Sequence, residues 1–206
     1  MNLIDLSYPI DNNIKTYPQD SPAYLIQEKY PAKDGYNNYR LEIGLHTGTH
    51  IDAPMHLTEN KKYISEYDLN RFCGHAVLID VRDEHEIKYK DNYDAIINED
   101  DIVLFYTGHD ARYGQKEYFS EHPVLNAGMA EFLVSKKIKM AGGDIPSPDR
   151  SPFLIHKILF KNEIMIIENL RNLGQLVNKK FELYAFPLNI RSDSSIVRAV
   201  AKILES

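Results

Sequence analysis

The chain has 206 residues and a formal net charge of -6. Its length is enough to bury a full core and predicts one domain over residues 1–206. The acidic balance, without any run of lysine or arginine, argues against a basic surface for nucleic acid or an anionic membrane. The single cysteine, Cys73, and an acid as early as Asp5 favour a cytoplasmic protein over a secreted one.

Short runs rich in β-branched and aromatic residues predict strands. In chain order the expected strands are Leu41–Leu45, Ala76–Val81, Ile102–Thr107, Ile138–Ala141, Ile164–Ile167 and Phe181–Phe186. Most of these runs are too continuous to leave one face in water. Apolar residues recur at helical spacing over residues 125–133 and again over 154–159, which predicts two helices.

Strands mixed with a few helices indicate a mixed α/β or an α+β fold. The connection around residues 82–100 is too short for a helix, which suggests that part of the sheet is antiparallel. A regular doubly wound fold is therefore not expected. The tail from Ser195 to Leu204 fits either a strand or a helix, and its pattern leaves both open.

The segment His46–His56, HTGTHIDAPMH, contains three of the eight histidines and one aspartate. On an extended strand its first two histidines would stand roughly 13 Å apart, at about 3.3 Å per residue, which is too far for one metal ion. A continuous helix is excluded by Pro54. Because Gly48 permits a sharp turn and Pro54 fixes a second one, the sequence predicts a bent loop whose imidazoles and carboxylate converge.

Imidazole nitrogen and carboxylate oxygen around one point suit borderline cations such as Zn²⁺ or Mn²⁺. Asp52 could bridge two such ions about 3.5 to 4 Å apart. His156 lies off the apolar stripe of its helix, and Glu168 ends an apolar strand where a carboxylate needs a partner, so both are candidate ligands. Each histidine alone would more often be a surface or packing residue, but the joint spacing favours a metal site.

The chain also resembles a known family, the cyclase family of metal-dependent hydrolases, which includes bacterial kynurenine formamidases and isatin hydrolases. The pattern H-x-G-T-H-x-D-x-P-x-H is carried here by His46, Gly48, Thr49, His50, Asp52, Pro54 and His56. Further similar stretches follow in order along nearly the whole chain: Asp5–Ser7, Tyr17–Asp20, Tyr106–Gly108, Gly143–Asp144, His156–Leu170 and Pro187–Leu188.

This resemblance implies a swivelling β/β/α fold, a homodimer or homotetramer, and a divalent metal centre with two ions, zinc or manganese. The implied metal ligands are His46, His50, Asp52, His156 and Glu168. His56 would be the proton donor and acceptor. Kynurenine formamidases carry tryptophan in place of Tyr17 and usually an aromatic residue in place of His109, so these two positions are candidate substrate contacts that differ from the family.

The ligand types and the resemblance together predict hydrolysis of a C–N bond in a small aryl formamide, amide or lactam. A divalent cation can lower the pKa of bound water to about 7 and polarise a carbonyl group. The imidazole of His56 could then move the proton. The alternative is a non-catalytic metal-binding or regulatory protein that retains the metal cage. A free imidazole beside the cage favours catalysis, because a structural site fills its coordination sphere.

Overall fold

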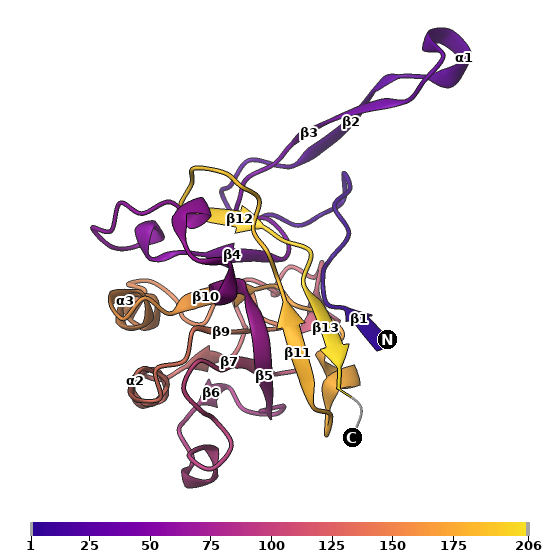
Figure 1. Ribbon diagram of the computed structural model, residues 1–206. Helices are drawn as coiled ribbons and strands as arrows, with labels where there is room; N and C mark the ends of the chain where they lie inside the picture. Colours follow the sequence, from indigo (N-terminus) through magenta and orange to yellow (C-terminus); the bar gives the residue numbers. More distant parts are fainter. Residues whose placement is uncertain (1, 205–206) are drawn as a thin grey trace.

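The computed structural model describes residues 2–204, and its main element is a nine-stranded mixed sheet. In spatial order the strands are β1 (Asn2–Asp5), β13 (Val200–Ile203), β11 (Phe181–Tyr184), β5 (Cys73–Asp80), β7 (Ile102–Tyr106), β9 (Met140–Gly143), β10 (Met165–Glu168), β4 (His50–Asp52) and β12 (Ser194–Ile196). The four strands from β5 to β10 are parallel, and the pairs on either side of them are antiparallel. Figure 1 shows the strands turning strongly from one edge to the other, so the sheet is curled.

Two helices, α2 (Ala127–Ser135) and α3 (Leu154–Lys161), cover one face of the sheet (Figure 1). The remaining elements are short: β2 (Tyr24–Lys29), α1 (Pro31–Asp34), β3 (Asn38–Glu42), η1 (Pro54–His56), η2 (Ile64–Glu66), η3 (Leu69–Phe72), β6 (Glu86–Ile87), η4 (Asp91–Tyr93), η5 (His109–Arg112), β8 (Val124–Leu125) and η6 (Leu173–Leu176). None of the helices described within residues 2–204 has both the length and the apolar character needed to cross a membrane.

The central strands are buried on both faces, which explains their continuous apolar runs. In β7, Ile102 and Leu104 join the core on the face away from the helices. Val103 and Phe105 alternate with them and join the core beneath α2 and α3. This period of two assigns every second residue of a strand to the helix-covered face.

Two glycines in β9 allow its neighbours to approach closely. A Cβ atom at Gly142 would lie 1.8 Å from the backbone oxygen of Ile167, and one at Gly143 would lie 2.5 Å from that of Phe105. Neither approach is possible for a larger residue without moving the backbone. Gly142 therefore helps to set the position of β10, which ends in Glu168, and Gly143 allows the approach of β7.

An arm formed by residues 24–42 projects from the body (Figure 1). It consists of the antiparallel pair β2 and β3 with α1 at its tip. Its tyrosines Tyr24, Tyr30, Tyr36 and Tyr39 are each about half exposed. A two-stranded ribbon by itself has only marginal stability in water.

The predicted mixed α/β fold with a partly antiparallel sheet is confirmed, and both helices form as expected. The expected place of the antiparallel part was wrong. The strands joined by residues 82–100, β5 and β7, are parallel, because that connection crosses over through β6 and η4 without needing a long helix. The antiparallel pairs lie toward the two edges of the sheet.

Two further expectations are settled by the structure. The strand predicted at Leu41–Leu45 is wrong beyond Glu42, because β3 belongs to the exposed arm and the chain turns from there toward His46. The undecided tail forms β12 and β13, so the helical alternative is wrong.

Candidate metal centre

The pairing of β4 with β10 puts candidate ligands on one face of the sheet. His50 lies opposite Glu168, and Asp52 lies opposite Ile166. Directly opposed residues of an antiparallel pair point to the same side. Since Ile166 packs in the core beneath the helices, the other three side chains face that side too, where α3 supplies His156.

The segment before and after β4 bends as the sequence indicated. Gly48 has a φ of +65°, and a Cβ there would lie 2.6 Å from the side chain of Ile14. Pro54 opens η1, which ends at His56. The prediction of a loop throughout was incomplete, however, because His50–Asp52 between the two bends is a buried strand.

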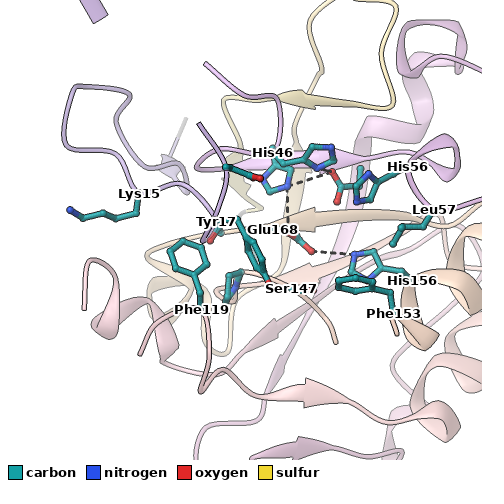
Figure 2. A pocket seen from close by; sticks show the side chains of 15 residues that line it. Lys15, Tyr17, His46, His56, Leu57, Phe119, Ser147, Phe153, His156 and Glu168 are labelled. Atoms are coloured by element: carbon teal, nitrogen blue, oxygen red, sulfur yellow. Dashed lines mark ion pairs between the residues drawn. The ribbon is translucent and has the colours of Figure 1, made fainter. Parts of the chain in front are cut away.

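The five predicted ligands converge on one centre, of which Figure 2 labels His46, His156 and Glu168. His46 Nδ1 lies 2.8 Å from Asp52 Oδ1. His50 Nε2 lies 3.4 Å from both Asp52 Oδ1 and Glu168 Oε2. His156 Nε2 lies 3.5 Å from Glu168 Oε1. Side chains from β4, β10, α3 and the loop before β4 thus meet although their residues are far apart in sequence.

Three atoms at this centre suit a metal ion because they are buried without a hydrogen-bond partner. They are His50 Nε2, Asp52 Oδ1 and Glu168 Oε1. Leaving such atoms unpaired in the interior is costly, and a divalent cation satisfies nitrogen and carboxylate oxygen together. The donor set therefore fits the metal that the sequence predicts.

Within residues 2–204, potential ligand atoms less than 4.8 Å from one another form two groups, one of His46, Asp52 and His56 and the other of His50, Asp52 and Glu168. Asp52 belongs to both, as a bridging carboxylate would. His156 stands outside both groups and joins the centre through its approach to Glu168.

The carboxylates of the centre stabilise the protonated forms of the nearby histidines more strongly than burial destabilises them. Burial alone would lower the pKa of His46, but Asp52 and Asp193 raise it to about 11. Burial likewise opposes the charged form of His156, whose pKa is nevertheless raised to about 9 by Asp149 and Glu168. A site that holds protons this firmly also favours a cation in their place.

Two carboxylates that contact the centre were missed by the sequence analysis. Asp149 Oδ1 lies 2.6 Å from His156 Nδ1, and its Oδ2 accepts a 2.6 Å hydrogen bond from the Ile155 N–H. Asp193 Oδ2 lies 3.0 Å from His46 Nε2 and 2.9 Å from His56 Nδ1. The available signal at Asp193 was a polar Ser-Asp-Ser-Ser run entering an apolar tail, which by itself indicates no site.

A pocket of about 280 Å³ opens beside this centre (Figure 2). Tyr17 lines it and meets Phe119 edge to face, with ring centroids 5.5 Å apart. The lining residues are Lys15, Tyr17, Asp20, His46, His50, Asp52, His56, Leu57, Phe119, Pro146, Ser147, Phe153, His156, Glu168 and Asn169.

His109, the other predicted substrate contact, is not among the described residues that line this pocket. It is buried, its Nε2 lies 2.8 Å from the Tyr118 carbonyl oxygen, and its ring stacks on that tyrosine at 5.0 Å. The Tyr118 hydroxyl in turn donates to Asn169 Oδ1 at 2.8 Å. The structure thus places His109 behind the pocket wall.

Residues 4–150 match the family model described as "Putative cyclase". The kynurenine formamidase of Bacillus cereus is 35% identical over 205 residues, which cover 97% of this chain and 96% of that protein. The kynurenine formamidase of Bacillus cytotoxicus is 32% identical over 207 residues, covering 98% and 97% of the two chains.

Solved structures share the fold. An isatin hydrolase bound to the product analogue thioisatinate has a TM-score of 0.87 at 23% identity, covering 99% of this chain and 92% of that one. A potential metal-dependent hydrolase with cyclase activity has a TM-score of 0.81 at 26% identity, covering 97% and 98%. With the family match and homology to kynurenine formamidases over nearly its full length, the chain belongs to the cyclase family.

Proposed function

We propose that this protein is a metal-dependent hydrolase that cleaves the C–N bond of a small aryl formamide, amide or lactam. The observation that carries the proposal is the set of buried, unpartnered donor atoms of His50, Asp52 and Glu168 beside a pocket with aromatic walls. Homology to kynurenine formamidases supports a substrate of this class.

The proposed ligands of two divalent ions, zinc or manganese, are His46, His50, Asp52, His156 and Glu168. The two groups that share Asp52 support a two-ion centre. When bound, the ions would supply Lewis acidity toward water and the substrate carbonyl. The protein residues fix the donor geometry and surround it with a largely buried wall, which strengthens electrostatic interactions.

His56 is the proposed proton donor and acceptor. Its Nδ1 is held by Asp193 at 2.9 Å, which leaves Nε2 for proton exchange. This nitrogen would take a proton from the attacking water and return it to the departing nitrogen as the C–N bond breaks. The same side chain then serves both halves of the reaction and ends in its starting state.

The pocket suits a flat, largely apolar substrate. Tyr17, Phe119, Phe153 and Leu57 provide apolar contact surface, and about 280 Å³ accommodates a small aromatic molecule. Tyr17 is therefore proposed to contact the substrate. For His109 we propose only an indirect effect, through Tyr118 and Asn169.

The test is to strip the protein with a chelator, restore Zn²⁺ or Mn²⁺, and assay N-formylkynurenine, isatin and related aryl amides. Metal-dependent release of the corresponding acid or amine is expected for at least one of them. Tight metal binding with no turnover of any substrate would favour the alternative, a non-catalytic metal-binding or regulatory protein.

We also infer a homodimer or homotetramer in which the arm of residues 24–42 packs on another copy. Its half-exposed tyrosines and its marginal stability as a free ribbon support this. One domain of the swivelling β/β/α type over residues 1–206 is proposed because β1 and β13, from opposite ends of the chain, pair in one sheet. A cytoplasmic location remains a prediction from the unpaired Cys73.

A further inference from the structure

A single carboxylate oxygen holds two histidines of the centre. Asp193 Oδ2 lies 3.0 Å from His46 Nε2 and 2.9 Å from His56 Nδ1. The two imidazole rings are tilted against each other with centroids 4.2 Å apart. One of these histidines is a proposed metal ligand and the other is the proposed proton carrier, so Asp193 contacts both functions at once.

The Asp193 carboxylate is itself held in place. Its Oδ1 accepts hydrogen bonds from the hydroxyls of Ser192 at 3.1 Å and Ser194 at 3.3 Å. Its backbone carbonyl accepts the Ala53 N–H at 2.9 Å, which ties the start of β12 to the chain between β4 and η1. These contacts of its Oδ1 and of its backbone hold the orientation of Oδ2 toward the two rings.

The position of the imidazole protons follows from what a carboxylate can do. An ionised carboxylate only accepts hydrogen bonds, so each ring nitrogen facing it must carry a proton. The hydroxyls of Ser192 and Ser194 donate to the other oxygen of Asp193, and such hydrogen bonds favour the ionised carboxylate. His46 Nδ1 faces the Asp52 carboxylate at 2.8 Å in the same way, so the Nδ1 proton must leave before this nitrogen can bind a metal ion, while the proton on Nε2 stays with Asp193.

We propose that Asp193 is a positioning residue that fixes the tautomers of His46 and His56. It holds a proton on His56 Nδ1, so that Nε2 is the nitrogen that takes up and returns the proton of the reaction. The catalytic consequence rests on the proposed function, whereas the tautomers can be measured without any substrate.

The two histidines differ in how much they depend on Asp193. Ser194 Oγ also lies 3.0 Å from His46 Nε2, so this ring keeps a partner when the carboxylate is removed. For His56 Nδ1, Asp193 is the partner that the structure of residues 2–204 provides. Loss of the carboxylate should therefore release His56 first and leave most of the metal bound.

The experiment compares Asp193→Asn and Asp193→Ala with Asp80→Asn, a matched control whose carboxylate bonds Arg82 outside the site. Nitrogen-15 NMR of the imidazoles in zinc-loaded protein reports which nitrogen carries the proton. The His56 signals are identified as those lost in His56→Gln. Metal content is measured on the same samples.

In wild-type protein and in Asp80→Asn, we expect His56 to be protonated at Nδ1. In both Asp193 variants we expect a mixture of tautomers or protonation at Nε2, with most of the zinc retained. If a substrate is found, kcat should fall by about 10²- to 10⁴-fold with a smaller change in KM. Asp193→Glu should recover part of both the tautomer and the rate.

An unchanged His56 tautomer in Asp193→Ala would overturn the inference. So would loss of zinc from Asp193→Asn with the His56 signals unaltered, because Asp193 would then be a metal ligand. Failure of every substrate would instead count against the proposed function, while the NMR result would still decide the role of Asp193.

Discussion

At the scale of single residues, Asp52 is the residue that the two groups of potential ligands share. It is buried, it lies in both groups of potential ligands, and its Oδ1 lacks a hydrogen bond. We expect Asp52→Ala to lose both ions, because neither group keeps three donors. Metal analysis of the purified variant beside Asp80→Ala tests this, and an undiminished metal content in Asp52→Ala would refute the bridging role.

His56 should behave differently from the ligands. We expect His56→Ala to keep most of its metal and to lose turnover by about 10²-fold or more, since its proposed task is proton transfer. Metal analysis and single-turnover kinetics on the same preparation separate the two effects. A variant that is isolated without metal would show that His56 is a ligand, as its place beside His46 and Asp52 allows.

The sequence indicated the candidate metal ligands better than it indicated the carboxylates that hold their imidazole rings. His46, His50 and Asp52 could be found because a glycine and a proline in one short segment limit how the chain bends. Asp149 could not, because irregular backbone connects it to α3, although it lies only seven positions before His156. Asp193 could not, because it reaches its two histidines through the tertiary fold, from 137 or more positions away. No local period relates such residues.

At the scale of elements, Gly142 allows β9 and β10 to approach each other closely. A Cβ at Gly142 would lie 1.8 Å from the Ile167 carbonyl oxygen. We expect Gly142→Ala to lower the free energy of unfolding by about 3 kcal/mol or more and to reduce metal content, because β10 carries Glu168. Chemical denaturation and metal analysis measure both effects.

Gly128 in α2 provides the matched control for that substitution. A Cβ there would meet no atom closer than 3.6 Å, the distance to Asn126 Oδ1. We expect Gly128→Ala to leave stability unchanged or to raise it by up to about 1 kcal/mol, since alanine favours helix. Equal losses in the two variants would show that the close approach in β9 is not the cause.

The positions of the strands along the sequence were easier to predict than the way in which the strands pair in the sheet. The apolar runs of β7 and β10 located those strands to within a few residues, because burial on both faces leaves a local signature. The direction of a strand relative to its neighbour leaves no such signature in the local sequence. The crossover between β5 and β7 contains only short elements, so the length of the connection suggested the wrong relation.

At the scale of the whole molecule, stability should fall in mild acid partly through His122. This side chain is buried, and burial with nearby Arg150 lowers its pKa from 6.5 to about 4. Between these values the unfolded chain binds a proton that the folded chain does not, so stability is lost as the pH falls from about 6.5 to about 4.

The measurement is denaturation of chelator-treated protein at pH 7.5 and pH 5, for wild type and His122→Asn. The wild type should lose up to about 2 kcal/mol more than the variant between these two pH values. Chelation in both samples removes any effect of metal release. Identical losses would mean that His122 titrates alike in the folded and unfolded chains.

The exposed tyrosines of the arm, residues 24–42, lead us to predict that the protein forms a dimer or a tetramer. We expect light scattering to give a dimer or tetramer for the wild type and smaller species for the triple variant Tyr30→Ser, Tyr36→Ser and Tyr39→Ser. Leu69→Ser, at a residue 66% exposed on the body, is the control and should keep the wild-type mass. A monomeric wild type would refute the proposed packing.

The pairing of β1 with β13 and of β4 with both β10 and β12 has a consequence for how the protein is made. While the ribosome is still extending the chain, His46, His50 and Asp52 emerge first, but Glu168 and Asp193 follow only more than 100 residues later. A growing polypeptide therefore lacks the full donor set until Glu168, at the end of β10, has been synthesised, and it lacks the support of Asp193 until just before β12. Incorporation of the cation is then a late event that accompanies closure of the sheet, and truncated chains should remain empty.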